Sequence, residues 1–393
     1  MINVGNKVDC CGCEACYNAC PSQSIKMNLD EEGFYYPQVN HDTCINCDLC
    51  ERVCPIFNYE PRKKNENQEA YLLQHKDNKI CRESTAGGAF TGIASYVIQK
   101  GGIVFGVEIT ETYKVRHTSV ETIEELRKLR NSKYVQSRVG YSFNHVRNEL
   151  KTGRVVCFSG TPCQIEGLRH FLGKDYENLI LVDVVCRAVP SPGVWDKFVQ
   201  YEIKQKGELS SVKFRDKALG YQYSTMELKT KDGKVYRDGI ECQPWLRMFF
   251  SGMIIRPSCT DCRFRSRYRN SDFTIWDCFP SYKYNKNFDE EKGTTRVLIH
   301  SEKGRKILKE IKSQFLLCEV SCERAVQNVS EMVISPSPHK NRSEFFSDFQ
   351  TSEMSLLIKK YFPVTLKLKL KKYARVGLNF VGLDKIIKRY IKK

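Results

Sequence analysis

The sequence lacks the features that several common protein classes need. No apolar run approaches the roughly 18 residues that a bilayer crossing requires. The first dozen residues, which already include Asp9 and Cys10, show no secretory signal pattern. There is no Gly-x4-Gly-Lys-Ser/Thr loop, no Gly-x-Gly-x-x-Gly after an expected strand, and no ordered Ser/His/Asp set. These absences leave kinase and hydrolase functions without support, and we expect a cytoplasmic protein with reduced thiols.

Histidine is scarce, with seven residues in 393. His117, His145 and His170 lie singly within expected strands or helices, where ordinary surface or core packing explains them. Cysteine is abundant in contrast, because nineteen occur in a chain far longer than the small secreted scaffolds that disulfides hold together. This content favours metal or redox chemistry.

The net charge of +17 is concentrated in the last tenth of the chain. Residues 355–393 contain twelve Lys and Arg against one acid, Asp384, so the rest of the chain is only mildly basic. We therefore expect no nucleic-acid partner. In the tail, apolar residues alternate with the basic ones: Leu356, Leu357, Ile358, Leu366, Leu368, Leu370, Ile386, Ile387, Tyr390 and Ile391. Such a segment suits either an anionic surface, here the inner face of the membrane, or packing on the protein body.

One cysteine pattern, C-x2-C-x2-C-x3-C-P, occurs twice near the start of the chain. Its copies are Cys10, Cys13, Cys16 and Cys20-Pro21, and Cys44, Cys47, Cys50 and Cys54-Pro55. In bacterial ferredoxins this run binds 4Fe-4S clusters, and the fourth cysteine of each run ligates the other cluster. We therefore predict a first cysteine set (Cys10, Cys13, Cys16 and Cys54) and a second cysteine set (Cys20, Cys44, Cys47 and Cys50), each with one cluster.

The alternatives for these cysteines are a zinc module or disulfides. Zinc sites usually pair two C-x2-C units across a longer spacer, and a third close cysteine has no role there. Cys11 falls outside the repeat and is expected to be a bystander thiol.

The pattern changes after residue 60. Residues 61–68 form a polar stretch without hydrophobic period, and beyond them apolar strands alternate with helices as in βαβ units. Hairpins follow at 226–236. We predict an α+β protein with four parts: a ferredoxin-like domain at 1–60, a linker at 61–70, a larger α/β domain with an antiparallel portion at 71–335, and a basic helical tail at 336–393. Within the larger domain, Ser84 is expected to cap a helix through Val97.

Four stretches of the larger domain occur in a familiar order. They are Ser84-Thr85-Ala86-Gly87-Gly88, Ser132-Lys133-Tyr134-Val135-Gln136-Ser137, Phe158-Ser159-Gly160-Thr161-Pro162-Cys163 and Asp183-Val184-Val185-Cys186. With Cys259-x2-Cys262 after Arg256-Pro257-Ser258, the chain resembles the family of coenzyme F-420 hydrogenase/dehydrogenase beta subunits over roughly residues 1 to 335. The resemblance implies a flavin-dependent oxidoreductase that carries FAD and iron-sulfur clusters. Relatives of this kind include bacterial proteins associated with surface-polysaccharide genes.

Two expected strand-to-helix turns suit the pyrophosphate of a flavin. Gly87-Gly88 and Gly160-Thr161-Pro162 each open a helix, where free backbone N–H groups and the positive dipole end attract phosphate. Glycines chosen for packing are the alternative at both turns. The predicted cofactor-binding residues are Ser84, Thr85, Gly87, Gly88, Ser132, Lys133, Tyr134, Gln136, Ser137, Gly160, Thr161 and Pro162.

A third cysteine set consists of Cys163, Cys186, Cys259 and Cys262. Cys163 lies near an expected helix N-terminus, which favours thiolate, and the set has the four thiols that another 4Fe-4S cluster needs. The resemblance implies such a cluster beside the flavin, whereas a zinc site or unrelated buried cysteines are the alternatives. The remaining cysteines are expected to be packing residues: Cys81, Cys157, Cys242, Cys318 and Cys322.

The chain departs from the family pattern at two places. Cys186-Arg187-Ala188 replaces Cys-His-Gly, so a permanently charged guanidinium stands where an imidazole would shuttle protons. Asp277-Cys278-Phe279-Pro280 replaces Asp-Phe/Tyr-Trp-Gly, and Cys278 is either a substitute ligand or a reactive thiol. The predicted catalytic residues are Cys163, Arg187 and Cys278.

The hypothesis that joins these features is an oxidoreductase that passes electrons from a ferredoxin-type donor through 4Fe-4S clusters to FAD and on to a small-molecule substrate. A subunit that relays electrons to a partner enzyme and an iron-sulfur redox sensor are the alternatives. The sensor would bind no flavin.

Overall fold

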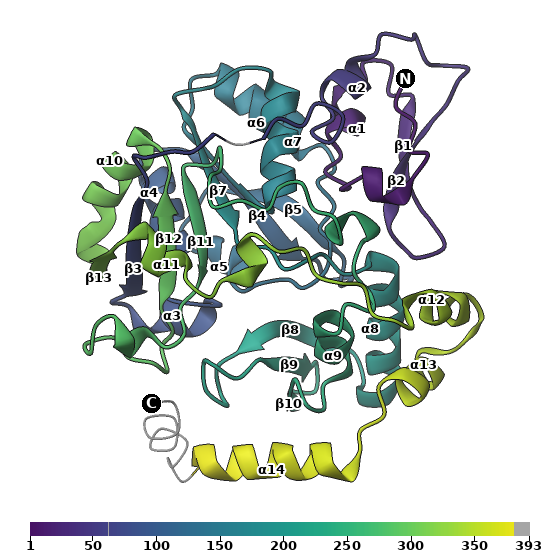
Figure 1. Ribbon diagram of the computed structural model, residues 1–393, viewed down its shortest axis with the longest axis vertical. Helices are drawn as coiled ribbons and strands as arrows, with labels where there is room; N and C mark the ends of the chain where they lie inside the picture. Colours follow the sequence, from purple (N-terminus) through teal and green to yellow (C-terminus); the bar gives the residue numbers. More distant parts are fainter. Residues whose placement is uncertain (62, 381–393) are drawn as a thin grey trace.

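The N-terminal segment repeats its backbone as well as its cysteines. The structure is a computed structural model that describes residues 1–61 and 63–380 (Figure 1). Gly12 and Asn46, at equivalent places in the two copies, both have positive φ, as do Glu14 and Asp48 two residues later. Each left-handed residue turns the chain sharply within a cysteine run. The elements of this module are a 3-10 helix at Lys7–Asp9, α1 (Ala15–Ala19), β1 (Ile25–Leu29), β2 (Tyr35–Val39) and α2 (Leu49–Arg52), with β1 and β2 antiparallel.

An eight-stranded mixed sheet forms the centre of the rest of the chain, in the order β13-β3-β12-β11-β7-β6-β4-β5. The β4-β6, β6-β7 and β7-β11 pairs are parallel, and the outer pairs are antiparallel. The strands are β3 (Glu69–His75), β4 (Ile103–Ile109), β5 (Val115–Val120), β6 (Val156–Gly160), β7 (Leu179–Val184), β11 (Phe273–Asp277), β12 (Thr295–Ile299) and β13 (Phe315–Val320).

Helices cover both faces of this sheet, which is why its inner strands are nearly continuous apolar runs. Successive residues of β4 show the division: Ile103 and Phe105 pack with the helices α6 and α7, whereas Val104 packs with α4 and α10 on the other face. The helices around the sheet are α3 (Asn78–Glu83), α4 (Ala89–Gln99), α5 (Leu126–Leu129), α6 (Ser142–Lys151), α7 (Pro162–Leu172), α10 (Glu302–Ile311) and α11 (Cys322–Val326).

A second core lies beside the central sheet. Its centre is the pair Trp195 and Trp245, whose ring centroids are 4.8 Å apart. It is built from an antiparallel sheet in the order β10-β9-β8 and from helices of the middle and C-terminal parts. These elements are α8 (Pro192–Lys206), β8 (Leu209–Asp216), β9 (Thr225–Thr230), β10 (Val235–Gly239), α9 (Pro244–Phe250), α12 (Arg342–Thr351) and α13 (Met354–Tyr361). Short 3-10 helices occur at Pro257–Cys259, Ser281–Lys283, Lys312–Gln314 and Ser330–Met332.

The ferredoxin-like module shares its core with the larger body. Cys11, Cys13 and Ile56 belong to the same hydrophobic cluster as Phe143 of α6 and Leu168 of α7. Figure 1 shows the module beside α6 and α7, away from α4 and α10. The cysteine loops are therefore held against the sheet domain rather than carried on a free arm.

The C-terminal helix α14 (Leu366–Phe380) lies along the β8-β9-β10 sheet (Figure 1). The expected apolar positions Ile386, Ile387, Tyr390 and Ile391 lie outside the described residues. In the part of the chain that is described, no helix has both the length and the apolar character needed to cross a membrane.

One local expectation is wrong. Ser84 does not cap the helix through Val97, because that helix, α4, begins at Ala89 behind Gly88. Gly88 has a φ of 84°, a left-handed conformation that glycine adopts without strain. Ser84 instead follows the end of α3. The other predicted helices and strands of the larger domain occur within a few residues of their expected bounds.

We predict that Gly193→Ala loosens the docking of the module. The backbones of Gly33 and Gly193 touch, and a Cβ on Gly193 would lie 2.6 Å from the Gly33 Cα. Overpacking of this kind typically costs about 1–3 kcal/mol. Anaerobic denaturant unfolding should show a loss of stability in that range. Gly5→Ala is the matched control, since nothing lies within 4 Å of its Cβ; equal stability of both variants would contradict the prediction.

Candidate functional site

The structure brings the first cysteine set together. The thiol of Cys54, from the second copy of the repeat, interacts electrostatically with those of Cys10, Cys13 and Cys16. Burial, followed by the Cys10 and Cys54 thiols, raises the pKa of the free Cys16 thiol well above its usual range. This cost falls away when metal binds a thiolate, so a set of neighbouring thiols, of which Cys13 is buried and the others are half-buried, fits the ligands of an iron-sulfur cluster.

No member of the second cysteine set belongs to the apolar cluster that the module shares with the body. Cys20 and Cys50 pack in one small apolar cluster with Ile25. The backbone N–H groups of Ser24 and Ile2 donate to the sulfurs of Cys20 and Cys50, each at 3.2 Å. Such N–H···S bonds tune cluster potentials, and they fit ligated thiolates. Cys44 and Cys47 precede α2 and are half-buried. The ligand assignments of both sets stay predictions.

The third cysteine set surrounds a small closed cavity of about 30 Å³. All four members line it, and Cys186 interacts electrostatically with the other three. Burial raises the pKa of the Cys259 thiol to about 12. Across residues 1–61 and 63–380, no three His, Cys, Asp or Glu side chains converge closely enough to hold a single metal ion. A four-iron cluster needs a wider arrangement, because each thiolate binds a different iron.

Two expectations about individual cysteines need correction. Cys163 does begin helix α7, but a hydrogen bond with Cys11 and burial raise the pKa of its thiol instead of lowering it. Cys11 is no bystander by position: it lies between Cys13 of the first set and Cys163 of the third, and it lines the small cavity. The position of Cys11 outside the repeated spacing did not predict that it would lie between the first and third cysteine sets.

A large cavity of about 900 Å³ adjoins the third cysteine set. The two cavities share part of their wall, since both are lined by Cys186, Ala188, Val189 and Glu331. The large cavity lies at the carboxyl ends of β6 and β7, where open α/β sheets bind their ligands. Its size is within the range of cofactor and ligand sites.

Most of the predicted cofactor-binding residues line this cavity. They are Ser84, Thr85, Gly88, Ser132, Lys133, Tyr134, Ser137, Gly160 and Thr161. Thr161 forms a capping box with Gln164 at the start of α7, and Gly88 precedes α4, so both helices begin at the cavity wall.

Three predicted cofactor-binding residues lie outside the wall of the large cavity. A Cβ on Gly87 would lie 2.2 Å from the Leu73 carbonyl oxygen, so this glycine serves strand packing, the alternative reading of that turn. Gln136 donates from Nε2 to the carbonyl oxygen of Cys11 at 3.1 Å and thus contacts the module. Pro162 borders the small cavity. None of the three lines the large cavity.

Positive charge dominates the large cavity. Asp277 and Glu331 are the acids among the described residues that line it. Arg215 is buried and donates from Nη1 to Asp277 at 3.1 Å and to the Tyr134 hydroxyl at 3.2 Å. The basic residues in its wall are Arg130, Lys133, Arg187, Arg215, Lys283, Arg296 and Arg324. This excess favours an anionic ligand.

The predicted catalytic residues Arg187 and Cys278 differ in their placement. Arg187 lines the large cavity, pairs with Glu331 at 3.2 Å and donates to the Phe250 carbonyl. Cys278 is fully buried beside Leu72 and lines neither cavity, and burial raises its pKa to about 11. Neither a ligand role nor a reactive thiol at Cys278 is therefore supported by the geometry.

Comparisons with known proteins match two parts of the chain. Residues 153–323 match the family model for the C terminus of the coenzyme F420 hydrogenase/dehydrogenase beta subunit, and residues 9–58 match a 4Fe-4S dicluster domain. The F subunit of the F(420)H(2) dehydrogenase of Methanosarcina mazei is 23% identical over 240 residues, which cover 58% of this chain and 66% of that relative.

Other relatives match the N-terminal module alone. An uncharacterized ferredoxin of Methanocaldococcus jannaschii is 38% identical over 64 residues, covering 15% of this chain and 82% of that protein. The VorC subunit of the ketoisovalerate oxidoreductase of Methanothermobacter marburgensis is 34% identical over 55 residues, covering 14% and 70%. Among solved structures, a chain of the F420-reducing [NiFe] hydrogenase complex from Methanosarcina barkeri aligns with a TM-score of 0.44 and 14% identity, covering 79% of this chain and 96% of that one.

We predict that anion binding in the large cavity weakens as pH rises from 6 to 8. Burial lowers the pKa of Lys133 to about 7, so its ammonium is charged below that pH and neutral above it. Calorimetric titration of the flavin-free protein with FAD, whose pyrophosphate charge is constant over this range, should show a several-fold loss of affinity. Lys133→Arg, which stays charged, should remove most of this dependence; the same pH profile in both proteins would contradict the assignment.

Proposed function

Because the chain combines a domain of the family of coenzyme F420 hydrogenase/dehydrogenase beta subunits with a 4Fe-4S dicluster domain, we propose that it is an iron-sulfur flavoprotein oxidoreductase. In this proposal a ferredoxin-type donor supplies electrons to the N-terminal clusters, which pass them through a third cluster to FAD and then to an organic substrate. The chain's relation to subunits of oxidoreductase complexes fits this role.

The observation that carries the proposal is the spatial order of the three cysteine sets. Cys13 and Cys54 of the first set belong to the apolar cluster shared with the body, whereas no member of the second set does. The third set borders the large cavity through Cys186. Cys11 lies between the first and third sets. The three sets thus form a continuous series from the module to the cavity.

The large cavity suits a flavin dinucleotide. Two helix N-termini and several basic side chains meet at its wall, and both features favour a pyrophosphate. When bound, the clusters carry single electrons, and a flavin collects two of them with protons and delivers a hydride equivalent.

The chain's own residues would hold and orient the ligands. Lys133 and Arg215 supply positive charge against an anionic group, and Tyr134, stacked on Phe249 at 4.8 Å between ring centroids, offers a flat aromatic wall. Arg187 keeps its proton, so the proton that accompanies hydride transfer comes from another group or from water. These roles, like the FAD itself, are part of the proposal.

A second candidate is an electron-relay subunit whose partner performs the chemistry. The matched relative from Methanosarcina mazei is named as a subunit, which favours this reading. Turnover of a small molecule by the isolated chain with reduced ferredoxin would decide for the enzyme, and turnover only with added partner subunits would decide for the relay. A deazaflavin of the F420 type and a surface-polysaccharide precursor are both substrates that follow from the resemblance alone.

We further propose a cytoplasmic location with peripheral contact to the membrane through α14. Arg375 and Lys372 tie one side of this helix to Glu241 and Asp238 of the body. The opposite side carries exposed apolar residues at i, i+4 and i+7, flanked by lysines: Leu366, Leu370 and Tyr373, which are 73%, 61% and 66% exposed. An apolar stripe with basic flanks matches an anionic lipid surface.

The order of the cysteine sets predicts the effect of Cys186→Ser. Loss of the third cluster should lower the iron content from about twelve to about eight per chain. Reduced ferredoxin should then still bleach the N-terminal clusters, while reduction of the flavin slows at least tenfold. Cys318→Ser is the control, since Cys318 belongs to none of the sets. Unchanged iron content, or flavin reduction at the original rate, would overturn the proposed path.

The α14 proposal predicts salt-sensitive binding to vesicles that contain phosphatidylglycerol, and no binding to pure phosphatidylcholine. Leu366→Gln with Leu370→Gln should abolish sedimentation with the anionic vesicles while keeping the charge of the helix. Val333→Gln with Ile334→Gln, a pair that is equally exposed elsewhere, should leave binding intact. Binding by the α14 variant at the original level would refute the membrane role.

A further inference from the structure

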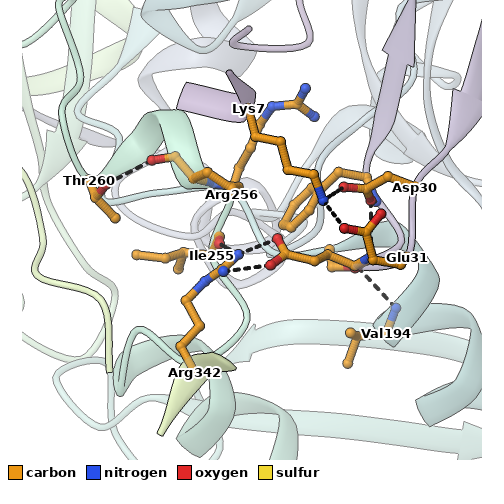
Figure 2. A network of polar contacts seen from close by, with 12 residues as sticks. Lys7, Asp30, Glu31, Val194, Ile255, Arg256, Thr260 and Arg342 are labelled. Carbon is orange, nitrogen blue, oxygen red and sulfur yellow. Dashed lines mark hydrogen bonds and ion pairs between the residues drawn. The ribbon is translucent and has the colours of Figure 1, made fainter. Parts of the chain in front are cut away.

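The guanidinium of Arg256 is buried directly beside the first cysteine set. Its side chain is among the largest fully buried ones of the described residues, with 0% exposure. Nη2 lies 3.4 Å from the Cys10 sulfur, and Nε donates to the Cys10 carbonyl oxygen at 2.7 Å. Figure 2 shows Arg256 at the junction between the module and the body. A charged donor thus contacts a predicted cluster ligand.

No carboxylate compensates this charge. Within residues 1–61 and 63–380, the recorded partners of Arg256 are the carbonyl of Tyr35, the amide of Gln136, the atoms of Cys10 and the rings of Phe34 and Tyr36. A buried cation is costly without a negative partner. Cys10 has the largest electrostatic effect on the guanidinium, followed by Tyr36, Cys11 and Cys259. Of these, Cys10 is a predicted cluster ligand and would be a thiolate when it binds iron.

The cysteine loop is shaped to admit this contact. Gly12 has a φ of 68°, and a Cβ there would lie 2.8 Å from Nη1 of Arg256 and 2.4 Å from Nε2 of Gln136. Arg256 also directly precedes the 3-10 helix Pro257–Cys259, which supplies Cys259 to the third cysteine set. The same short segment therefore contributes a ligand to the third set and a cation that contacts the first set. The guanidinium therefore lies near thiols of both the first and the third cysteine sets.

We propose that Arg256 is a positioning residue that raises the midpoint potential of the cluster held by the first cysteine set. A cluster that gains one electron gains one negative charge, which a fixed cation and an N–H···S donor stabilise. The guanidinium keeps its proton throughout, so no proton transfer accompanies the step. Electrons from the outer cluster would then collect next to the third set. The inference rests on the proposed function only in assuming clusters at the predicted ligands.

The test is a potentiometric titration of the full-length, anaerobically prepared protein, followed by electron paramagnetic resonance. In Arg256→Gln, one cluster should become reducible only at a more negative potential while the others keep theirs. Arg256→Lys, which keeps the charge but loses the planar donor set, should shift the same cluster in the same direction by less. Iron content is measured for each variant.

Arg342→Gln is the matched control. Arg342 is half-buried at the same junction (Figure 2), where it pairs with both oxygens of Glu32 at 2.7 and 2.6 Å. Among the described residues it has no hydrogen bond or ion pair with a cysteine. Its loss should leave every midpoint potential unchanged. The proposal is wrong if the Arg256 variants keep their iron and all their midpoint potentials stay as in the original protein. It is also wrong if Arg342→Gln shifts the same midpoint potential by the same amount. Failure of flavin reduction would instead count against the proposed function. The potentiometric titration of the clusters needs neither flavin nor substrate, so the two failures can be told apart.

Discussion

The docking of the ferredoxin-like module on the larger body depends on an ion pair between the buried Glu14 and the partly exposed Arg138. Glu14 follows a cluster cysteine in the module, yet it is 2% exposed and accepts hydrogen bonds from Arg138 at 2.6 Å and from the Gly140 N–H at 2.9 Å. Burial raises the pKa of this carboxyl even beside the guanidinium, which shows how little water reaches it. Loss of Arg138 would leave the buried Glu14 carboxylate without its charged partner, which is costly.

This docking places the cysteine runs of the module against the larger body. A two-stranded module of this size has little core of its own, and here Cys11, Cys13 and Ile56 complete an apolar cluster begun by α6 and α7. Cys11 links this cluster to the third cysteine set, because it hydrogen-bonds both to Cys13 and to Cys163. Stability of the module and continuity of the cysteine series therefore come from the same surface.

Local patterns in the sequence were sufficient to predict the role of the cysteine runs and most helices and strands of the larger domain. The duplicated spacing predicted a dicluster module, which the 4Fe-4S family match confirms, and apolar runs such as 103–107 and 179–185 predicted sheet strands. Such local patterns could not predict contacts between segments that are distant in the sequence. Arg256 reaches Cys10 across 246 positions, and a glycine that packs, such as Gly87, looks the same in sequence as one that lines a cavity, such as Gly88.

The cysteines of the module differ in their exposure to dioxygen. Cys44 and Cys47 of the outer set are half-buried beside Ile45, whose side chain is 64% exposed, whereas Cys13 and Cys11 are enclosed where the module meets the body. Oxidants attack accessible sulfur first. Air would thus reach a cluster held by Cys44 and Cys47 first, and the buried junction that keeps the module in place would outlast the loss of that cluster.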